Sequence, residues 1–273
     1  MQGIHEFIPT GIKAKYINLL LQVGFDTIDF GSFVSPKAIP QMQDTVEVLK
    51  KLDLGTTKSK LLAIIANYRG AEDAAQHDEI FYLGYPFSIS QTFQQRNANT
   101  SIDNAFDTVK RINELCSTKN KELLIYLSMG FGNPYGDEWN AEIVQNWAEK
   151  LIDEGIKTIA LSDTVGVATP EQIIGIYPAL CDIFPDTEFG LHLHATPYNW
   201  QEKIAASYKS GCKRFDAAIK GYGGCPMAAD ELTGNIATEN LIYYLQSKNE
   251  QLGLNLDKFG EAIEYANTVF NIH

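Results

Sequence analysis

Residues 158–170, TIALSDTVGVATP, show which kind of fold this chain adopts. The first six of them contain the apolar run Ile159, Ala160 and Leu161, which predicts a short buried strand that ends on the carboxylate of Asp163. Gly166 then allows a turn, and Thr169-Pro170 is a typical start for a helix over residues 170–181. A strand followed at once by a helix is the repeating unit of a parallel α/β protein.

The same unit recurs on both sides of this stretch. Strand-like runs are predicted at residues 25–33, 60–66, 79–87, 122–130, 158–163, 188–194 and 214–219. Helices are predicted at residues 13–23, 38–52, 71–76, 102–116, 141–153, 170–181, 200–209 and 237–246. Seven strands separated by helices or long crossovers predict a parallel sheet.

Two observations favour a (β/α)₈ TIM barrel over a doubly wound sheet. Polar residues gather where strands end, which is where barrel enzymes hold their chemistry. These residues are Asp29, Asp163, His192 and His194. No glycine-rich phosphate loop follows an early strand. The 273 residues suit one such domain, residues 1–273, but the chain opens almost directly in a helix, so strand 1 of the barrel is missing from this sequence.

Composition and charge exclude several classes of partner. The formal net charge of -12 disfavours nucleic acid and anionic membrane surfaces. No apolar run reaches the ~18 residues of a membrane span, and the first residues do not resemble a signal peptide. The four cysteines, at 116, 181, 212 and 225, are far apart and predict reduced thiols. A cytoplasmic protein without nucleic-acid or membrane partners is therefore expected.

The run LHLHAT, residues 191–196, indicates a metal site. His192 and His194 stand two positions apart on a predicted strand, so both imidazoles point to the same face. Two neighbouring imidazoles can chelate a cation, although a hydrogen-bonded interior pair is the alternative. The amide oxygen of Asn235 could complete the site; alternatively, Asn235 is the N-cap of the following helix.

The glycine-rich stretch GYGGCPMAADELTGN, residues 221–235, presents one thiol. Its glycines let the backbone turn sharply, and Pro226 biases Cys225 toward an extended conformation that projects the thiol from the loop. A thiol can exchange a proton near neutral pH, so Cys225 is a candidate acid/base; alternatively, it is a small apolar residue in an ordinary glycine turn. Asp29 and Asp163 are candidate catalytic carboxylates, with strand-end turn residues as the alternative.

Five motifs along almost the whole chain resemble the 3-hydroxy-3-methylglutaryl-CoA lyase family of metal-dependent TIM barrels. They are SFVSPKAIPQM (32–42), SDTVGVATP (162–170), HLHAT (192–196), KGYGGCPMA (220–228) and GNIATENLIYYL (234–245). The resemblance implies a C–C lyase that cleaves an acyl-CoA substrate to acetyl-CoA and acetoacetate. It implies a divalent cation, Mg²⁺ or Mn²⁺, on His192, His194 and Asn235, with Cys225 as the catalytic acid/base and Asp29 and Asp163 in the same pocket.

The sequence departs from that family at three places. Asp29 stands where the family usually has a glutamate. Ala195 stands where the family has an aspartate after its second histidine, and the family's Arg-Asp pair would precede Met1. We therefore expect the natural protein to carry an additional N-terminal strand ending in Arg-Asp. A related acyl-CoA lyase or aldolase and a catalytically silent barrel that binds partners are the alternatives.

The substrate contacts and the assembly are less specified by the resemblance. Ser32, Phe33 and Asn97 are candidates for the substrate pocket. A homodimer is the candidate assembly.

Overall fold

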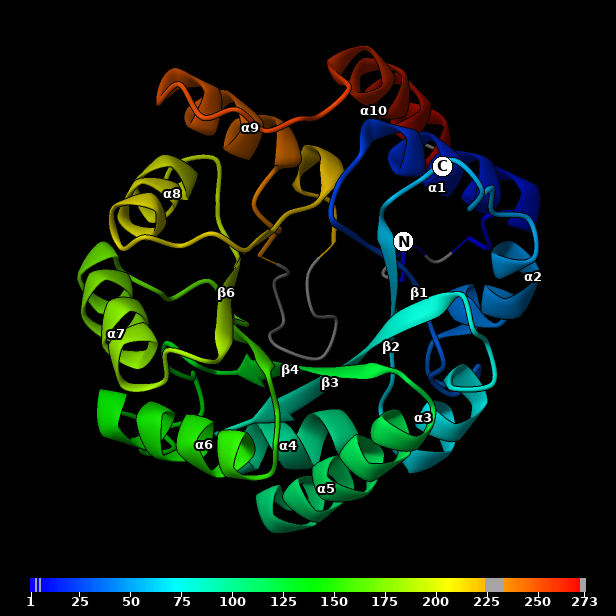
Figure 1. The fold of residues 1–273 in the computed structure, drawn as a ribbon. Coiled ribbons are helices and arrows are strands. Elements are labelled where there is room, and N and C mark those ends of the chain that lie inside the picture. Colours follow the sequence, from blue (N-terminus) through cyan, green and yellow to red (C-terminus); the bar gives the residue numbers. More distant parts are fainter. Residues whose placement is uncertain (3, 5, 224–232, 271–273) are drawn as a thin grey trace.

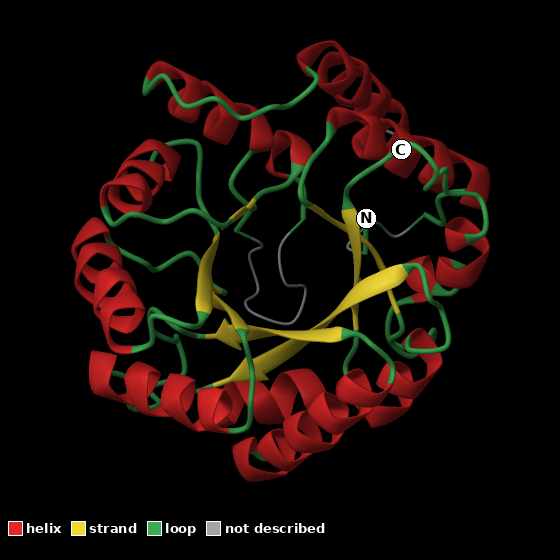
Figure 2. Cartoon of the chain, viewed as in Figure 1, coloured by secondary structure: helices red, strands yellow, loops and turns green. Residues whose placement is uncertain are grey.

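The computed structural model describes residues 1–270 apart from 3, 5 and 224–232. A curled sheet of seven parallel strands in the order β1-β2-β3-β4-β5-β6-β7 forms its centre. Helices surround the sheet on its outer side (Figure 1), and Figure 2 shows this separation of strands and helices by colour. The predicted TIM-barrel type of fold is confirmed, and the described residues contribute seven parallel strands to its curled sheet.

The strands are β1 (Thr27–Ser32), β2 (Lys60–Ile64), β3 (Ile80–Ser88), β4 (Glu122–Ser128), β5 (Thr158–Asp163), β6 (Glu188–Leu193) and β7 (Phe215–Asp216). The α-helices are α1 (Thr10–Val23), α2 (Thr45–Leu49), α3 (Tyr68–Ala74), α4 (Gln91–Ala98), α5 (Ile102–Thr118), α6 (Ala141–Asp153), α7 (Pro170–Ile183), α8 (Trp200–Lys209), α9 (Thr238–Ser247) and α10 (Leu256–Phe270). Two short 3₁₀ helices are η1 (Pro40–Met42) and η2 (Ile219–Gly221).

The unit at residues 158–183 forms for the reasons that its sequence suggests. All six residues of β5 are buried. Helix α7 starts with a capping box: the Thr169 hydroxyl accepts from the Gln172 N–H at 3.3 Å, and the Gln172 side chain accepts from the Thr169 N–H at 2.9 Å. Pro170 fits the first turn because the missing N–H would have no partner there.

The two faces of the sheet form separate cores. Every second side chain along a strand, such as Ile125 and Leu127 on β4, packs against the helices. The side chains between them, such as Leu124 and Tyr126, pack with side chains of β2, β3 and β5 inside the barrel. Full burial of each such aliphatic side chain contributes about 1.5–3 kcal/mol. Alternation along a strand therefore shows which side chains face the barrel interior.

The helix predicted at residues 38–52 is wrong, because the structure has η1 followed by the five-residue α2 in this region. Pro40 lacks the N–H that a continuous helix would need. Asp44 does not cap α2 with its side chain; it accepts from Lys13 Nζ at 2.7 Å and from the Thr10 hydroxyl at 2.7 Å. Contacts with α1 thus override the local helical pattern.

The sheet has two ends, β1 and β7. No ladder joins them among the residues that the structure describes. Strand β7 is shorter than the predicted run at 214–219, and an isolated parallel bridge between Ala218 and Ala237 continues its direction. Within the described parts of the chain, no helix has the length and apolar character needed to cross a membrane.

Two glycine substitutions test the packing of helices on this barrel. A Cβ at Gly70 in α3 would lie 2.5 Å from the backbone oxygen of Phe33, whereas a Cβ at Gly175 in α7 would meet no heavy atom within 4 Å. We expect Gly70→Ala to destabilise the fold by about 1–3 kcal/mol through overpacking. Gly175→Ala should stabilise it by about 0.5–1 kcal/mol, because alanine loses less backbone entropy in a helix. Urea unfolding of both variants measures the difference, and effects of equal sign would contradict this packing.

Candidate active site

The two histidines lie at the carboxyl end of β6. Leu191 and Leu193 belong to the core between sheet and helices, so His192 and His194 lie on the opposite side, toward the barrel interior. Their ring centroids are 5.4 Å apart. The Tyr126 ring lies edge-on to His192, also at 5.4 Å between centroids. The structure therefore places both imidazoles as the i, i+2 spacing predicted.

Asn235 lies directly beside them. An isolated antiparallel bridge pairs His194 with Asn235, and the Ala195 N–H donates to the Gly234 carbonyl at 2.8 Å. The amide nitrogen of Asn235 donates to the Tyr222 carbonyl at 3.1 Å, so its amide oxygen is the atom suited to bind a cation. Its alternative interpretation as a helix N-cap is wrong, because Ala237 is the N-cap of α9 and makes no side-chain cap bond.

Asp216 is a functional candidate that the sequence analysis missed. Its carboxylate oxygen Oδ2 lies 3.1 Å from Nδ1 of His192, its register partner on β6. A carboxylate that binds one ring nitrogen of a histidine orients the ring and leaves the other nitrogen for a ligand. The only sequence signal was an acid in a predicted strand, and the register that brings it beside His192 is not readable from one sequence.

Electrostatics favour the metal-binding form of His194. The residue is 3% exposed, and burial lowers the pKa of its imidazole to about 3, with His192 acting in the same direction. Its ring is therefore neutral at physiological pH, as a metal ligand must be. Two imidazoles and an amide oxygen thus fit a divalent cation. Among the described residues, no three His, Cys, Asp or Glu side chains form a metal-binding group, so the amide is essential to this assignment.

Asp29 also faces the barrel interior. Its neighbours Ile28 and Phe30 belong to the sheet–helix core, and Asp29 itself keeps accessible surface at the open inner face. Although Asp29 keeps accessible surface, many protein atoms surround its carboxyl group; the resulting desolvation raises its pKa to about 7, and the Asp216 carboxylate acts in the same direction. A carboxyl group with a pKa near neutrality suits proton transfer.

This raised pKa predicts how stability depends on pH. The folded chain holds the Asp29 proton up to about pH 7, whereas the unfolded chain releases it near 3.8. The contribution of Asp29 to the free energy of unfolding is therefore highest below pH 3.8 and falls as pH rises to about 7. We expect Asp29→Asn to raise Tm relative to wild type by an amount that grows between pH 4 and 7 and is constant above. Thermal unfolding of both proteins across this range measures it; a constant difference would contradict the raised pKa.

Asp163 faces the helical layer. Its carboxylate is completely buried: Oδ2 accepts from Lys203 Nζ at 2.6 Å, and Oδ1 accepts from the Ala168 N–H at 3.0 Å. Burial raises the pKa of Asp163, and the Lys203 ammonium opposes that shift. Lys203 is not predicted from the sequence, because a lysine in an amphipathic helix is ordinarily a surface residue.

The candidate substrate residues lie in two different elements. Ser32 ends β1, is 4% exposed, and carries a buried hydroxyl without a hydrogen-bond partner among the described residues. Phe33 follows it, with its N–H bound to the Ile64 carbonyl at 2.8 Å and its ring 5.7 Å from the His77 ring. Asn97 lies in α4, a helix that was not predicted. Their assignment to a substrate pocket stays a prediction.

Cys225 lies outside the described residues. The backbone leading to it has positive φ at Gly221 (66°) and Gly223 (109°), as expected for a sharp turn of glycines. Cys116, Cys181 and Cys212, the described cysteines, are free thiols. Burial raises the pKa of both Cys116 and Cys212 to about 12, which makes them inert.

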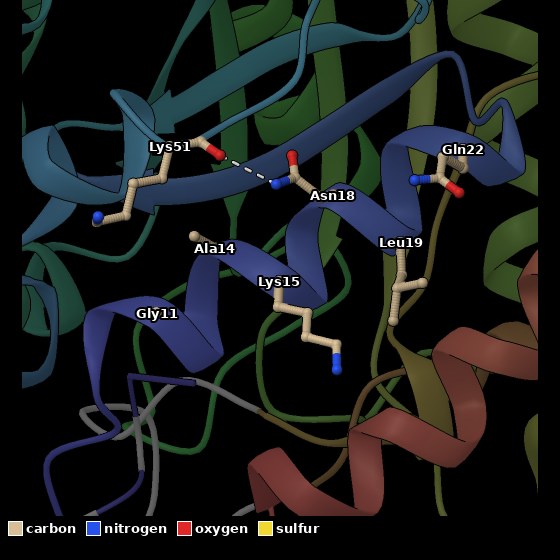
Figure 3. Close-up of a pocket in the computed structure, with 7 residues that line it drawn as sticks. All are labelled: Gly11, Ala14, Lys15, Asn18, Leu19, Gln22 and Lys51. Atoms are coloured by element: carbon tan, nitrogen blue, oxygen red, sulfur yellow. Dashed lines mark hydrogen bonds between the residues drawn. The ribbon is translucent and has the colours of Figure 1, made fainter.

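A hollow on the outer face of α1 has no part in this site. Figure 3 shows its lining side chains, and Asn18 there donates to the Lys51 carbonyl at 3.0 Å. The lining residues are Gly11, Ala14, Lys15, Asn18, Leu19, Gln22 and Lys51. None of the candidate site residues is among them. The candidate active site therefore remains the one at the carboxyl ends of the strands.

Known proteins resemble this chain along its whole length. Residues 1–265 match the family model described as HMGL-like. The hydroxymethylglutaryl-CoA lyase YngG of Bacillus subtilis is 31% identical over 270 residues, which cover 97% of this chain and 88% of that protein. The human mitochondrial hydroxymethylglutaryl-CoA lyase is 31% identical over 264 residues, or 96% of this chain and 80% of that protein.

Solved structures agree with these sequence matches. An HMG-CoA lyase from Acinetobacter baumannii, in complex with coenzyme A and 3-methylmalate, superposes with a TM-score of 0.91 at 30% identity and covers 99% of this chain and 87% of that one. The HMG-CoA lyase of Pseudomonas aeruginosa gives 0.91 at 28% identity over 100% of this chain and 90% of that one. With its barrel and its two histidines at the end of β6, the chain belongs to the HMGL-like family of lyases.

Proposed function

We propose that this chain cleaves 3-hydroxy-3-methylglutaryl-CoA to acetyl-CoA and acetoacetate. The observation that carries the proposal is the pair of neighbouring histidines at the carboxyl end of β6, with Asn235 bridged to His194 through the backbone, in a chain that belongs to a family of lyases. The relatives named above are hydroxymethylglutaryl-CoA lyases, and one of their structures holds coenzyme A with a hydroxy acid.

The cation of the proposed site is Mg²⁺ or Mn²⁺, held by His192, His194 and Asn235. When bound, it would supply positive charge that lowers the pKa of the substrate hydroxyl and fixes the reacting oxygens. The protein contributes orientation: Asp216 holds His192 through Nδ1, and the 194–235 bridge keeps Asn235 beside His194. The donor set is neutral, so affinity for a hard cation depends on this preorganisation.

Proton transfers in the reaction fall to two residues. Asp29, whose pKa is about 7, is suited to accept the proton of the substrate's tertiary hydroxyl. The hydroxyl oxygen then forms the ketone of acetoacetate while the neighbouring C–C bond breaks and its electron pair enters the thioester enolate. The Cys225 thiol gives its proton to the enolate carbon and so completes acetyl-CoA. Asp163, paired with Lys203, supports the site from the helical side.

A substrate comparison tests this proposal. Chelator-treated protein receives Mg²⁺ or Mn²⁺ together with either 3-hydroxy-3-methylglutaryl-CoA or a 3-hydroxyacyl-CoA that lacks the distal carboxylate. We measure acetyl-CoA, the product that cleavage of either substrate would release. We expect it from the first substrate only, together with an equal amount of acetoacetate, and only with the cation. Preferred turnover of another acyl-CoA would replace the proposal by the related-lyase alternative. Cation binding without turnover of either substrate would favour a silent barrel.

We extend the proposal to a cytoplasmic homodimer. Light scattering of the purified chain at several concentrations measures the assembly, and the mass of a single chain at every concentration would reject the dimer.

A further inference from the structure

Lys203 is a buried charge at the back of the candidate site. It lies in α8 and is 1% exposed. Its ammonium binds three acceptors: Asp163 Oδ2 at 2.6 Å, the His194 carbonyl at 2.8 Å and the Gly166 carbonyl at 3.0 Å. An ammonium has three N–H donors, so the arrangement uses all of them.

The three acceptors belong to the part of the barrel that carries the chemistry. Asp163 ends β5, Gly166 lies in the loop that follows it, and His194 follows β6. The second oxygen of Asp163 accepts from the Ala168 N–H, which holds the same loop from its other side. One lysine thus ties together the ends of two neighbouring strands.

The bond from Lys203 to the His194 carbonyl also affects the position of Asn235, another predicted metal ligand. The Ala195 N–H donates to the Gly234 carbonyl at 2.8 Å, and the Ile236 N–H donates to the Leu193 carbonyl at 3.3 Å. These two bonds flank Asn235 and hold it against the backbone of residues 193–195. Lys203 fixes that same backbone at residue 194.

We infer that Lys203 is a positioning residue, which holds His194 and through it Asn235 in place, and that Asp163 keeps the lysine charge in the correct position. This assigns Asp163 a positioning part in place of direct contact with substrate. A buried ion pair adds little net stability compared with apolar residues of similar volume. The Lys203–Asp163 pair therefore contributes mainly by holding the bonded groups in fixed positions. The inference rests on the proposed function in one respect: the reaction that His194 and Asn235 serve is the proposed cleavage.

The test compares Lys203→Met with Lys121→Met. Lys121 is a matched control: it is 7% exposed and donates to the His77 and Ile80 carbonyls at 2.7 and 2.8 Å, but it lies at the opposite end of the barrel, before β4. The first measurement is Mn²⁺ affinity of the chelator-treated proteins by electron paramagnetic resonance. The second is amide hydrogen exchange of residues 192–196 and 234–237 without metal.

We expect both variants to lower Tm. Only Lys203→Met should weaken Mn²⁺ binding, by about 10–100-fold, as loss of an outer-shell partner does. Only Lys203→Met should speed exchange in the two segments. Equal affinity and equal exchange in the two variants would reduce Lys203 to an ordinary structural contact.

A double variant separates position from charge. Lys203→Met with Asp163→Asn leaves no unpaired buried carboxylate, so it should regain Tm relative to Lys203→Met and serves as the test protein if the single variant does not fold. Its Mn²⁺ affinity should stay weak, and wild-type affinity in it would overturn the inference. If wild type binds no Mn²⁺, the proposed metal site fails, and hydrogen exchange alone decides the part of Lys203.

Discussion

Replacing His192 by alanine is expected to abolish divalent-cation binding and not merely to slow turnover. The imidazole is one of three proposed ligands, and the other two are a single neutral imidazole and an amide oxygen, which hold Mg²⁺ or Mn²⁺ weakly. Loss of an outer-shell partner already costs about 10–100-fold in affinity, so loss of the ligand itself should exceed 100-fold. Calorimetric titration of chelator-treated protein with Mn²⁺ measures it.

Asp216→Asn provides the graded comparison for this experiment. The amide side chain would keep the shape of the carboxylate that lies 3.1 Å from His192 but lose its charge, so we expect binding to weaken by about 10–100-fold and to persist. If His192→Ala bound Mn²⁺ as tightly as wild type, the two histidines would be an interior pair and the metal assignment would be wrong.

Cys225→Ser is expected to lower kcat by roughly 10²–10⁴ while cation binding persists. Serine has nearly the same shape, but its hydroxyl has a far higher pKa than a thiol, so it exchanges a proton poorly near neutral pH. The reaction would still form the enolate, and its protonation would become slow. Acetoacetate release under saturating substrate measures the rate.

Cys181→Ser is the matched control for that variant. Cys181 is a free thiol in α7, in the outer helical layer, and we expect its replacement to leave kcat unchanged. An unchanged kcat in Cys225→Ser would make that thiol a bystander. An equal loss in both variants would point to a general effect of removing thiols.

Local patterns predicted the alternation of strands and helices, and the polar residues at the strand ends then favoured the barrel over a doubly wound sheet. Most of the strands contain a short apolar run, and Thr169-Pro170 marks a helix start that the structure shows as a capping box. The i, i+2 spacing of the two histidines also predicted their common face, because alternation along a strand needs no tertiary information. What was missed depends on distant contacts. Asp216 reaches His192 only through the register of β6 and β7, and Lys203 reaches Asp163 across 40 positions.

The errors have the same physical origin. The helical pattern at 38–52 gave way to Pro40 and to the ion pair between Lys13 and Asp44, which lie 31 positions apart. Asn235 fits an N-cap by sequence, but the bridge to His194 places it two residues before the cap of α9. In both cases a tertiary contact decided between local alternatives.

A mass balance of the reaction tests the proposed lyase activity most directly. Wild-type protein is incubated with 3-hydroxy-3-methylglutaryl-CoA and Mn²⁺, and substrate, acetyl-CoA, acetoacetate and free coenzyme A are measured together by chromatography. We expect acetyl-CoA and acetoacetate to appear in equal amounts as the substrate disappears, without free coenzyme A. Intact substrate in the presence of cation-loaded protein, or free coenzyme A without acetoacetate, would contradict it.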